Sequence, residues 1–323
     1  MHISIVRQTF GLRDTKAWKM APRRQAIVSD NKWEEQFLQI LYRPFDSRWI
    51  FYHEDVIERP RPQVMRHMLR GNLGLVTARR NRLSRIDSFF CADKLVETKC
   101  GESTIQSYTF PLWLYPESDI KDLFSHQRQA RERTPNLAPS LLPTLKQAHG
   151  RQATPEEVFH YIYAVLYSST YRTKYTQLLK RDFPRVPFTQ DSKLFTRMAK
   201  LGKRLVGLHL LESHELDPPR VRFQGTGGNN VEKLLFNAKE KRVYISKAQY
   251  FEGIEPEVWE YRIGGYQVPE KWLKDRKGRT LSVEDIRHYC RTVTALAKTI
   301  KIQAEIDVLY LDVEKHALSI PVS

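Results

Sequence analysis

The chain has 323 residues, of which 41% are hydrophobic, and this suffices for a buried core in one large or two ordinary domains. Lysine and arginine number 53 against 37 aspartate and glutamate, and the net charge of +16 favours a polyanionic partner, with nucleic acid as the leading class. No signal-peptide pattern and no run of about 18 apolar residues occurs, so we expect a cytoplasmic protein without a membrane span.

Residues 1–115 are predicted to form a mixed α/β region. From Asp30 onward, Trp33, Phe37, Ile40 and Leu41 recur at helical spacing and predict a helix.

A β-prone run over 49–52 follows the helix-breaking Pro44, and we expect most of the aromatic residues around it to be core. A short proline-led helix over 59–69 and a buried strand over 73–77 come next. The strand ends in Arg79 and Arg80, which could meet a phosphate backbone or form an ordinary solvated edge.

The apolar period is lost between residues 116 and 153, which are predicted to be a loop or linker with one short helix. Residues 154–323 are predicted to be mainly helical. A capping box at Thr154 opens this part, and a period-two stretch at about 220–250 predicts an antiparallel β insert. The last long helix begins at Ser282 and is expected to end near residue 307, before short strands.

Basic residues recur in two segments of this second half. A helix predicted over 171–182 exposes Arg172, Lys174 and Arg181, while Leu178 packs inward. The segment FPRVPF, 183–188, holds Arg185 between two prolines, which lowers the entropy lost when that arginine is fixed on a ligand. A plain connector between helices is the alternative interpretation.

The stretch from Val258 to Asp285 combines three aromatic residues, a Gly-Gly pair and a basic run. Glycine allows a sharp turn or a close approach to another surface. The donors around that turn suit phosphates and base edges, and they are Arg262, Gln267, Lys271, Lys274 and Arg276. An ordinary buried turn would have the same composition.

Catalytic motifs are limited to partial matches. Asp217-Pro218-Pro219-Arg220 is similar to the Asp/Asn-Pro-Pro-aromatic loop of amino-methyltransferases, but an arginine replaces the aromatic platform that a flipped base needs. Asp87, Glu97 and Lys99 have the residue types of a metal-dependent nuclease at a spacing common by chance. The cysteines Cys91, Cys100 and Cys290 form no CxxC pair. We therefore expect no catalytic residue, metal or cofactor in this chain.

Several collinear motifs resemble one known family over nearly the whole chain. They are YRPFDSRWIFY, RPRPQVMRHML, NLGLVTAR, PEEVFHYIYAVLYSSTYRTKY, DFPRVPF, LGKRLVGLHLLE and WEYRIGGYQVPEKWLKDRKGRTLSVEDIRHY. In that order they resemble the C-terminal specificity, or target recognition, region of type ISP restriction-modification enzymes. The resemblance implies double-stranded DNA as partner, together with adenine methyltransferase and nuclease domains or subunits that bind S-adenosylmethionine and Mg²⁺.

The family's nuclease, motor and methyltransferase motifs do not occur in this sequence, which implies a fragment, a split subunit or a remnant. The residues themselves supply the DNA-binding candidates: Arg172, Lys174, Arg181, Arg185, Arg262, Gln267, Lys271, Lys274 and Arg276, with Arg79 and Arg80 as further choices. Two other functions are compatible with the sequence. One is an active methyltransferase or nuclease with unconventional motifs, and the other is an assembly subunit that binds an acidic partner protein.

Overall fold

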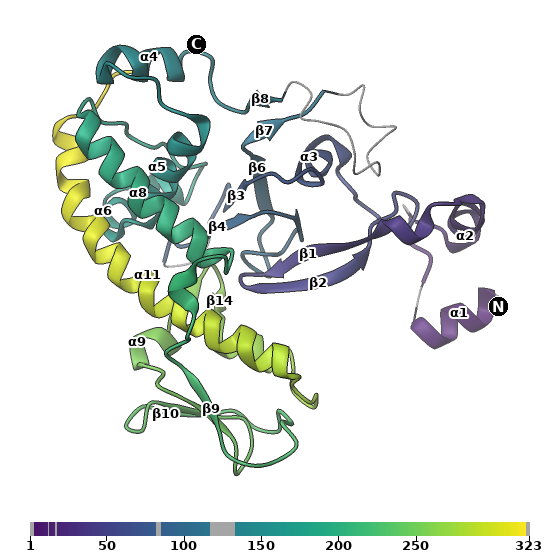
Figure 1. Ribbon diagram of the computed structural model, residues 1–323. Helices are drawn as coiled ribbons and strands as arrows, with labels where there is room; N and C mark the ends of the chain where they lie inside the picture. The colour runs from purple at the N-terminus through teal and green to yellow at the C-terminus, as the bar shows by residue number, and fades with distance from the viewer. Residues whose placement is uncertain (1–2, 12, 17, 82–84, 117–132, 321–323) are drawn as a thin grey trace.

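The computed structural model describes residues 3–11, 13–16, 18–81, 85–116 and 133–320. Within these ranges, helices gather on one side of the molecule and short, mainly antiparallel sheets lie beside and below them (Figure 1). The α+β class predicted from the sequence is confirmed.

On the helical side, two long helices, α8 (Ser192–His209) and α11 (Val283–Lys315), pack against α5 (Pro155–Tyr167). Thr154 and Glu157 form the predicted capping box at the start of α5, and Ser282 and Asp285 form the other at the start of α11. Close packing of α5 on α8, with α11 against both, buries the aromatic residues of α5. The helices on this side are α4 (Leu141–His149), α5 (Pro155–Tyr167), α6 (Ser169–Lys174), α7 (Thr176–Leu179), α8 (Ser192–His209) and α11 (Val283–Lys315).

Three small sheets occupy the first half of the chain. In the first, β1 (Phe37–Arg43) pairs antiparallel with β2 (Asp46–Phe51) and parallel with β5 (Leu95–Val96). In the second, β3 (Gly74–Ala78) lies between β4 (Phe89–Ala92) and β6 (Ser107–Pro111). The third pairs β7 (Trp113–Leu114) with β8 (Thr134–Pro135), and α3 (Pro62–Met68) packs beside β6.

The predicted β insert is a four-stranded antiparallel sheet at the bottom of Figure 1. Its order is β10 (Leu235–Asn237), β11 (Arg242–Tyr244), β12 (Tyr250–Glu252) and β9 (Arg222–Gln224). The short 3-10 helix η3 (His214–Leu216) precedes it. After it come α9 (Pro256–Trp259), the hairpin of β13 (Arg262–Ile263) and β14 (Tyr266–Gln267), and α10 (Val268–Lys274). This insert confirms the period-two prediction for about 220–250.

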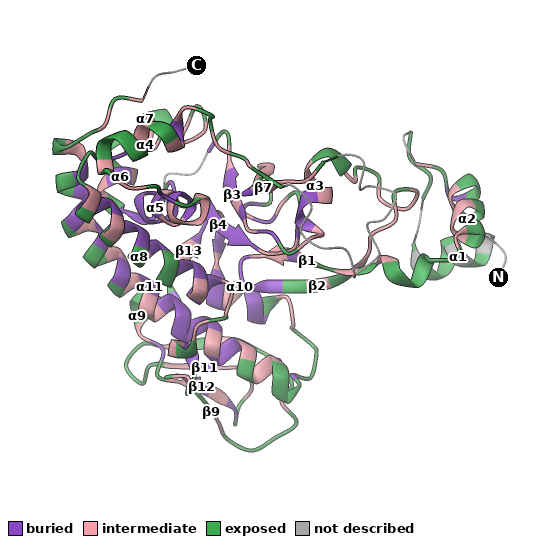
Figure 2. Cartoon of the chain, turned by 45° about the horizontal axis from the view of Figure 1, so that its top comes forward, coloured by how far each residue is buried: buried purple, intermediate pink, exposed green. Residues whose placement is uncertain are grey.

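The N-terminal elements extend away from this body. They are α1 (Ile3–Phe10), α2 (Met20–Ser29) and the 3-10 helix η1 (Trp33–Gln36), and they carry little buried surface (Figure 2). Trp33 stacks edge-on against Phe37, which in turn contacts Phe51. Despite these contacts, the side chains of Trp33 and Phe37 remain exposed.

Two predicted elements are wrong in type. The helix expected from Asp30 through Leu41 is instead a turn of 3-10 helix followed by β1, because the apolar residues over 37–43 pair with both β2 and β5. The first of the strands expected after residue 307, over 308–313, is instead part of the last turns of α11. Leu309, Tyr310 and Val313 are buried there at helical spacing. Of the second, over 317–322, Ala317 forms an isolated bridge with Thr189, and residues 321–322 lie outside the described ranges.

Two burial predictions are also wrong. Phe45 is buried, but Trp49 is 70% exposed because it stands on the outer face of the β1–β2 hairpin. The helix predicted over 171–182 is divided at Tyr175 into α6 and α7, and this division leaves Leu178 60% exposed.

The range 116–153 contains the helix α4, in agreement with the one short helix predicted within this linker, and residues 117–132 lie outside the described ranges. The side chain of Leu145 in α4 is fully buried. One continuous core cluster joins residues from Leu41 to Val313. The division at 116–153 stays a prediction.

The buried side chain of His209, in α8, contacts both α5 and α11. Nε2 of His209 lies 2.9 Å from the Thr299 hydroxyl, which donates to the Ala295 carbonyl and must therefore accept from His209. Nδ1 lies 2.6 Å from the Tyr163 hydroxyl. Burial lowers the pKa of His209 to about 3, so the ring is neutral in the folded protein.

We expect this histidine to make the fold sensitive to acid. Above an unfolded-state pKa of about 6.5, His209 is neutral in both states; below it, only the unfolded chain gains a proton. The free energy of unfolding should therefore fall by about 2 kcal/mol from this residue between pH 7 and pH 5. Urea unfolding at both pH values would measure it. The His209→Gln variant should lose that part of the pH dependence, and an unchanged pH dependence would contradict the assignment.

Candidate nucleic-acid interface

Two segments distant in sequence meet along one surface. The first consists of residues 79–81 and 85–88, after β3, and the second runs from α6 to residue 188. The Asn81 amide donates to the Lys180 carbonyl at 3.3 Å, and Arg79 Nε donates to the Asp182 carboxylate at 3.1 Å. Three pockets open along this junction, and the arginines that line them are Arg79, Arg80, Arg85, Arg172, Arg181, Arg185 and Arg262. We refer to these seven residues as the arginine seam.

The proline-locked segment 183–188 forms one wall of the first pocket. Tyr171 donates its hydroxyl to the Arg185 carbonyl and Tyr161 donates to the Pro187 carbonyl, both at 2.9 Å. These bonds fix the extended backbone, while the Arg185 side chain stays exposed. The pocket has a volume of about 390 Å³ and is apolar except at Arg181, Asp182 and Arg185. Two predicted cations thus stand beside an aromatic hollow.

The second pocket lies on the other side of Phe183. Its volume is about 310 Å³, and Arg79 and Arg80 line it together with Gln106 and Tyr108. The Tyr108 ring meets the Phe183 ring edge-on at 5.2 Å. Within the described ranges the side chains of Arg80, Arg181 and Arg185 make neither a hydrogen bond nor an ion pair with the protein. These exposed guanidinium groups therefore retain their donors for a ligand.

The third pocket, of about 280 Å³, contains a buried carboxylate among arginines. Arg85, Asp87, Arg172 and Arg262 line it with Tyr261 and other residues. Burial raises the pKa of Asp87, and the nearby Arg172, Arg85 and Arg262 guanidinium groups oppose that rise. Asp87 is 4% exposed, and its carboxylate lies 3.5 Å from Arg85 Nε. The pocket carries more positive than negative side chains.

Arg172 is held inside the protein. Its Nε donates to the Leu166 carbonyl at 2.5 Å, and its guanidinium group lies over the rings of Tyr167 and Phe89. Lys174, two residues further along α6, instead pairs with Glu314 at 2.5 Å on the surface. Arg172 therefore contributes mainly its positive field to the seam, and Lys174 already has a partner within the protein.

The Gly-Gly pair forms a buried turn between β13 and β14. The Gly264 amide donates to the Asp87 carbonyl at 3.1 Å, and the Gly265 amide donates to the Gly101 carbonyl at 3.0 Å. Gly264 has a φ of 58°, and a Cβ there would lie 1.9 Å from the Gly101 carbonyl oxygen. Only glycine fits this approach. The turn thereby brings Arg262 to the third pocket.

Most donors near that turn already have partners within the protein. Gln267 donates to the Trp259 carbonyl at 2.8 Å, Lys271 pairs with Asp275 at 2.5 Å, and Lys274 pairs with Glu270 at 2.9 Å. As DNA contacts these three residues stay predictions, and their geometry favours a structural role.

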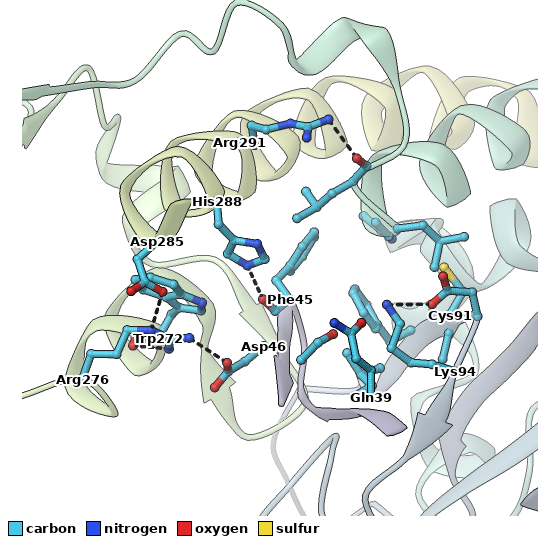
Figure 3. A pocket seen from close by; sticks show the side chains of 18 residues that line it. Gln39, Phe45, Asp46, Cys91, Lys94, Trp272, Arg276, Asp285, His288 and Arg291 are labelled. Atoms are coloured by element: carbon cyan, nitrogen blue, oxygen red, sulfur yellow. Dashed lines mark hydrogen bonds and ion pairs between the residues drawn. The ribbon is translucent and has the colours of Figure 1, made fainter. Parts of the chain in front are cut away.

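Arg276 is held more firmly than these donors. Its guanidinium group lies 3.4 Å from the centre of the Trp272 ring and pairs with the buried Asp46 at 2.9 Å. Figure 3 shows this pair in a pocket of about 370 Å³ between the β1–β2 hairpin and α11, where His288 contacts the Phe45 carbonyl. Arg276 therefore connects the hairpin to α10, and its contact with DNA also stays a prediction.

Arg85 is the residue of the seam that the sequence analysis missed. The available signal was the density of arginines in RRNRLSR, 79–85, directly after a buried strand. In the sequence, Asp87 also belongs to the nuclease-like set of Asp87, Glu97 and Lys99. The structure separates this set, since Glu97 pairs with Arg43 at 2.6 Å and Asp87 contacts Arg85.

Neither a metal-binding cluster nor a membrane-spanning helix occurs among the described residues. No group of three or more His, Cys, Asp or Glu side chains among the described residues could hold a metal ion. Among the same residues, none of the helices combines the length and apolar character needed to cross a membrane.

Comparison with known proteins defines the class of this chain. The family model of the type ISP C-terminal specificity domain matches residues 3–305, so the chain belongs to that family. A search of curated proteins gives no match.

Three solved structures have a fold similar to that of this chain. The cryoEM structure of the DrdV–DNA complex has a TM-score of 0.67 at 20% identity, over 84% of this chain and 28% of that chain. LlaBIII, an ATP-dependent type ISP restriction-modification enzyme bound to DNA, gives 0.65 at 18% identity, over 93% and 19%. A nuclease-deletion mutant of the type ISP enzyme LlaGI with a DNA substrate mimic gives 0.60 at 17%, over 84% and 25%. The chain thus spans less than a third of each relative.

Proposed function

We propose that this chain binds duplex DNA and supplies target specificity to a type ISP-like restriction-modification enzyme. The observation that carries the proposal is the arginine seam, where the side chains of Arg80, Arg181 and Arg185 are exposed and, within the described ranges, form no ion pair. The nearby candidates Lys274 and Arg276 are instead paired with carboxylates. Phosphate contacts from such side chains give affinity, and a few side chains that reach base edges give sequence preference. The solved relatives named above, which are bound to DNA or a DNA mimic, support the same assignment.

The chemistry of restriction and modification would then reside elsewhere. We propose that adenine methylation and cleavage are performed by methyltransferase and nuclease domains or subunits of the same system, which would bind S-adenosylmethionine and Mg²⁺. This chain would place those domains at their target. The membership of this chain in the family of the type ISP C-terminal specificity domain supports this proposal.

Removal of two seam arginines should weaken binding to any duplex. We expect Arg181→Ala with Arg185→Ala to lower the affinity for random duplex DNA and to reduce the slope of log affinity against log salt by about 2, because each lost phosphate contact releases about one counterion fewer. Fluorescence anisotropy between about 50 and 200 mM salt would measure both quantities.

Lys241→Ala is the matched control, because Lys241 pairs with Glu255 on the β insert. This variant should leave the slope unchanged. Equal losses in both variants would show that only overall charge matters. Selection of bound duplexes from a random pool tests specificity itself, and recovery of no consensus would overturn the proposed function.

A further inference from the structure

Within the arginine seam, the exposed side chain of Arg85 lies against the buried carboxylate of Asp87. The two residues stand on the segment that leads into β4, and both line the third pocket. The side chain of Arg85 is 69% exposed, whereas that of Asp87 is 4% exposed. An exposed cation is thus anchored at its base by a buried carboxylate.

The anchoring contact determines which donors of Arg85 remain available. Its Nε faces the Asp87 carboxylate at 3.5 Å, and the guanidinium group is planar and rigid. If the carboxylate occupies the Nε edge, the end-on edge of the guanidinium group, formed by one N–H from each Nη, remains for a ligand. That edge offers a pair of parallel donors.

Asp87 is itself held in place by the Gly-Gly turn. Its carbonyl accepts the Gly264 amide, and its carboxylate makes no hydrogen bond among the residues that the structure describes. Within the same ranges Arg85 is the one cation at ion-pair distance, while Arg172 and Arg262 also act on the carboxylate electrostatically. The fixed backbone holds the buried carboxylate beside Arg85, and the charge attraction biases the orientation of its guanidinium group before any ligand arrives.

A buried carboxylate is unfavourable in a simple phosphate site. Phosphate binding depends on positive charge, and an aspartate beneath the arginine lowers the local potential. A contact to a base edge depends on orientation instead, since guanine presents its N7 and O6 acceptors side by side in the major groove. The Arg85–Asp87 arrangement therefore suits base recognition better than backbone contact.

We propose that Arg85, oriented by Asp87, reads a guanine of the target site through its O6 and N7 atoms. Asp87 acts as a positioning residue and does not contact DNA, because both of its carboxylate oxygens are buried. The inference rests on the proposed function and adds the base class that this part of the seam selects.

The test compares three proteins in selection from a random duplex pool, namely the wild type, Arg85→Lys and Asp87→Asn. Arg85→Lys keeps the charge but removes the paired donors, and we expect preference for guanine at one position to fall about 5- to 150-fold. Asp87→Asn removes a negative charge, so affinity for random DNA should hold or rise while preference at the same position falls. Arg222→Lys, at an exposed position of β9 outside the seam, is the control that should keep the wild-type consensus.

Each outcome decides a separate question. If Arg85→Lys retains the wild-type preference at every position, the inference fails while the proposed function stands. If the wild type itself yields no consensus, both fail together. Thermal unfolding monitors the fold, and should Asp87→Asn not fold, Arg85→Lys alone decides because that side chain lies at the surface.

Discussion

Replacing Trp272 with alanine should lower the free energy of unfolding by about 3 to 5 kcal/mol. The ring is 2% exposed, lies under the Arg276 guanidinium group and packs on Tyr289 and His288. The loss combines the transfer of a large ring to water, the cavity left behind and a lost cation–π contact. Urea unfolding followed by circular dichroism would measure it.

Trp49 is the matched control for this substitution. It is the same residue type but 70% exposed on the hairpin, so Trp49→Ala should change stability by no more than about 0.5 kcal/mol. A small loss in Trp272→Ala, or equal losses in both variants, would contradict the burial of Trp272.

Gly264→Ala should be the most damaging single-methyl addition near the seam, at about 3 to 4 kcal/mol. Alanine pays about 1 kcal/mol for the left-handed backbone conformation. The clash with the Gly101 carbonyl then adds an overpacking cost of up to about 3 kcal/mol, since a backbone atom cannot rotate away. Denaturant unfolding gives the loss in stability. DNA binding should also weaken, because Arg262 precedes this turn and Asp87 accepts a hydrogen bond from it.

Gly278→Ala isolates the backbone part of that effect. Gly278 has a φ of 77°, but an added Cβ meets nothing within 4 Å. We expect a loss of about 1 kcal/mol and unchanged DNA binding. If the two glycine variants lose equal stability, the tight approach of Gly264 to Gly101 does not exist in solution.

Local signals in the sequence predicted the elements whose determinants are themselves local. The capping boxes at Thr154 and Ser282 began α5 and α11 where expected, and alternation around Phe223 and Phe251 predicted the β insert. The segment 37–43 was assigned wrongly because its apolar residues fit both a helical and an alternating period. Its pairing with β2 and β5 decided between them, and pairing is not visible in a single sequence.

The site was predictable only in part for the same physical reason. Exposed arginines beside prolines and at a strand end could be identified from local pattern, as Arg185 and Arg80 illustrate. The contact of Gly264 with Asp87 joins positions far apart in the chain, and it decides which arginines share a pocket. Gln267 and Arg276 carried the same donor chemistry in sequence, but their partners at Trp259 and Asp46 are tertiary.

Helix α11 connects the β1–β2 hairpin to the region beside the arginine seam. Its 33 residues span about 50 Å. Its first turns carry His288, which meets the hairpin at Phe45, and its last turns carry Glu314, which meets Lys174 beside the seam. A rotation of the hairpin would therefore be transmitted to Lys174, beside the seam, through one continuous helix without an intervening loop.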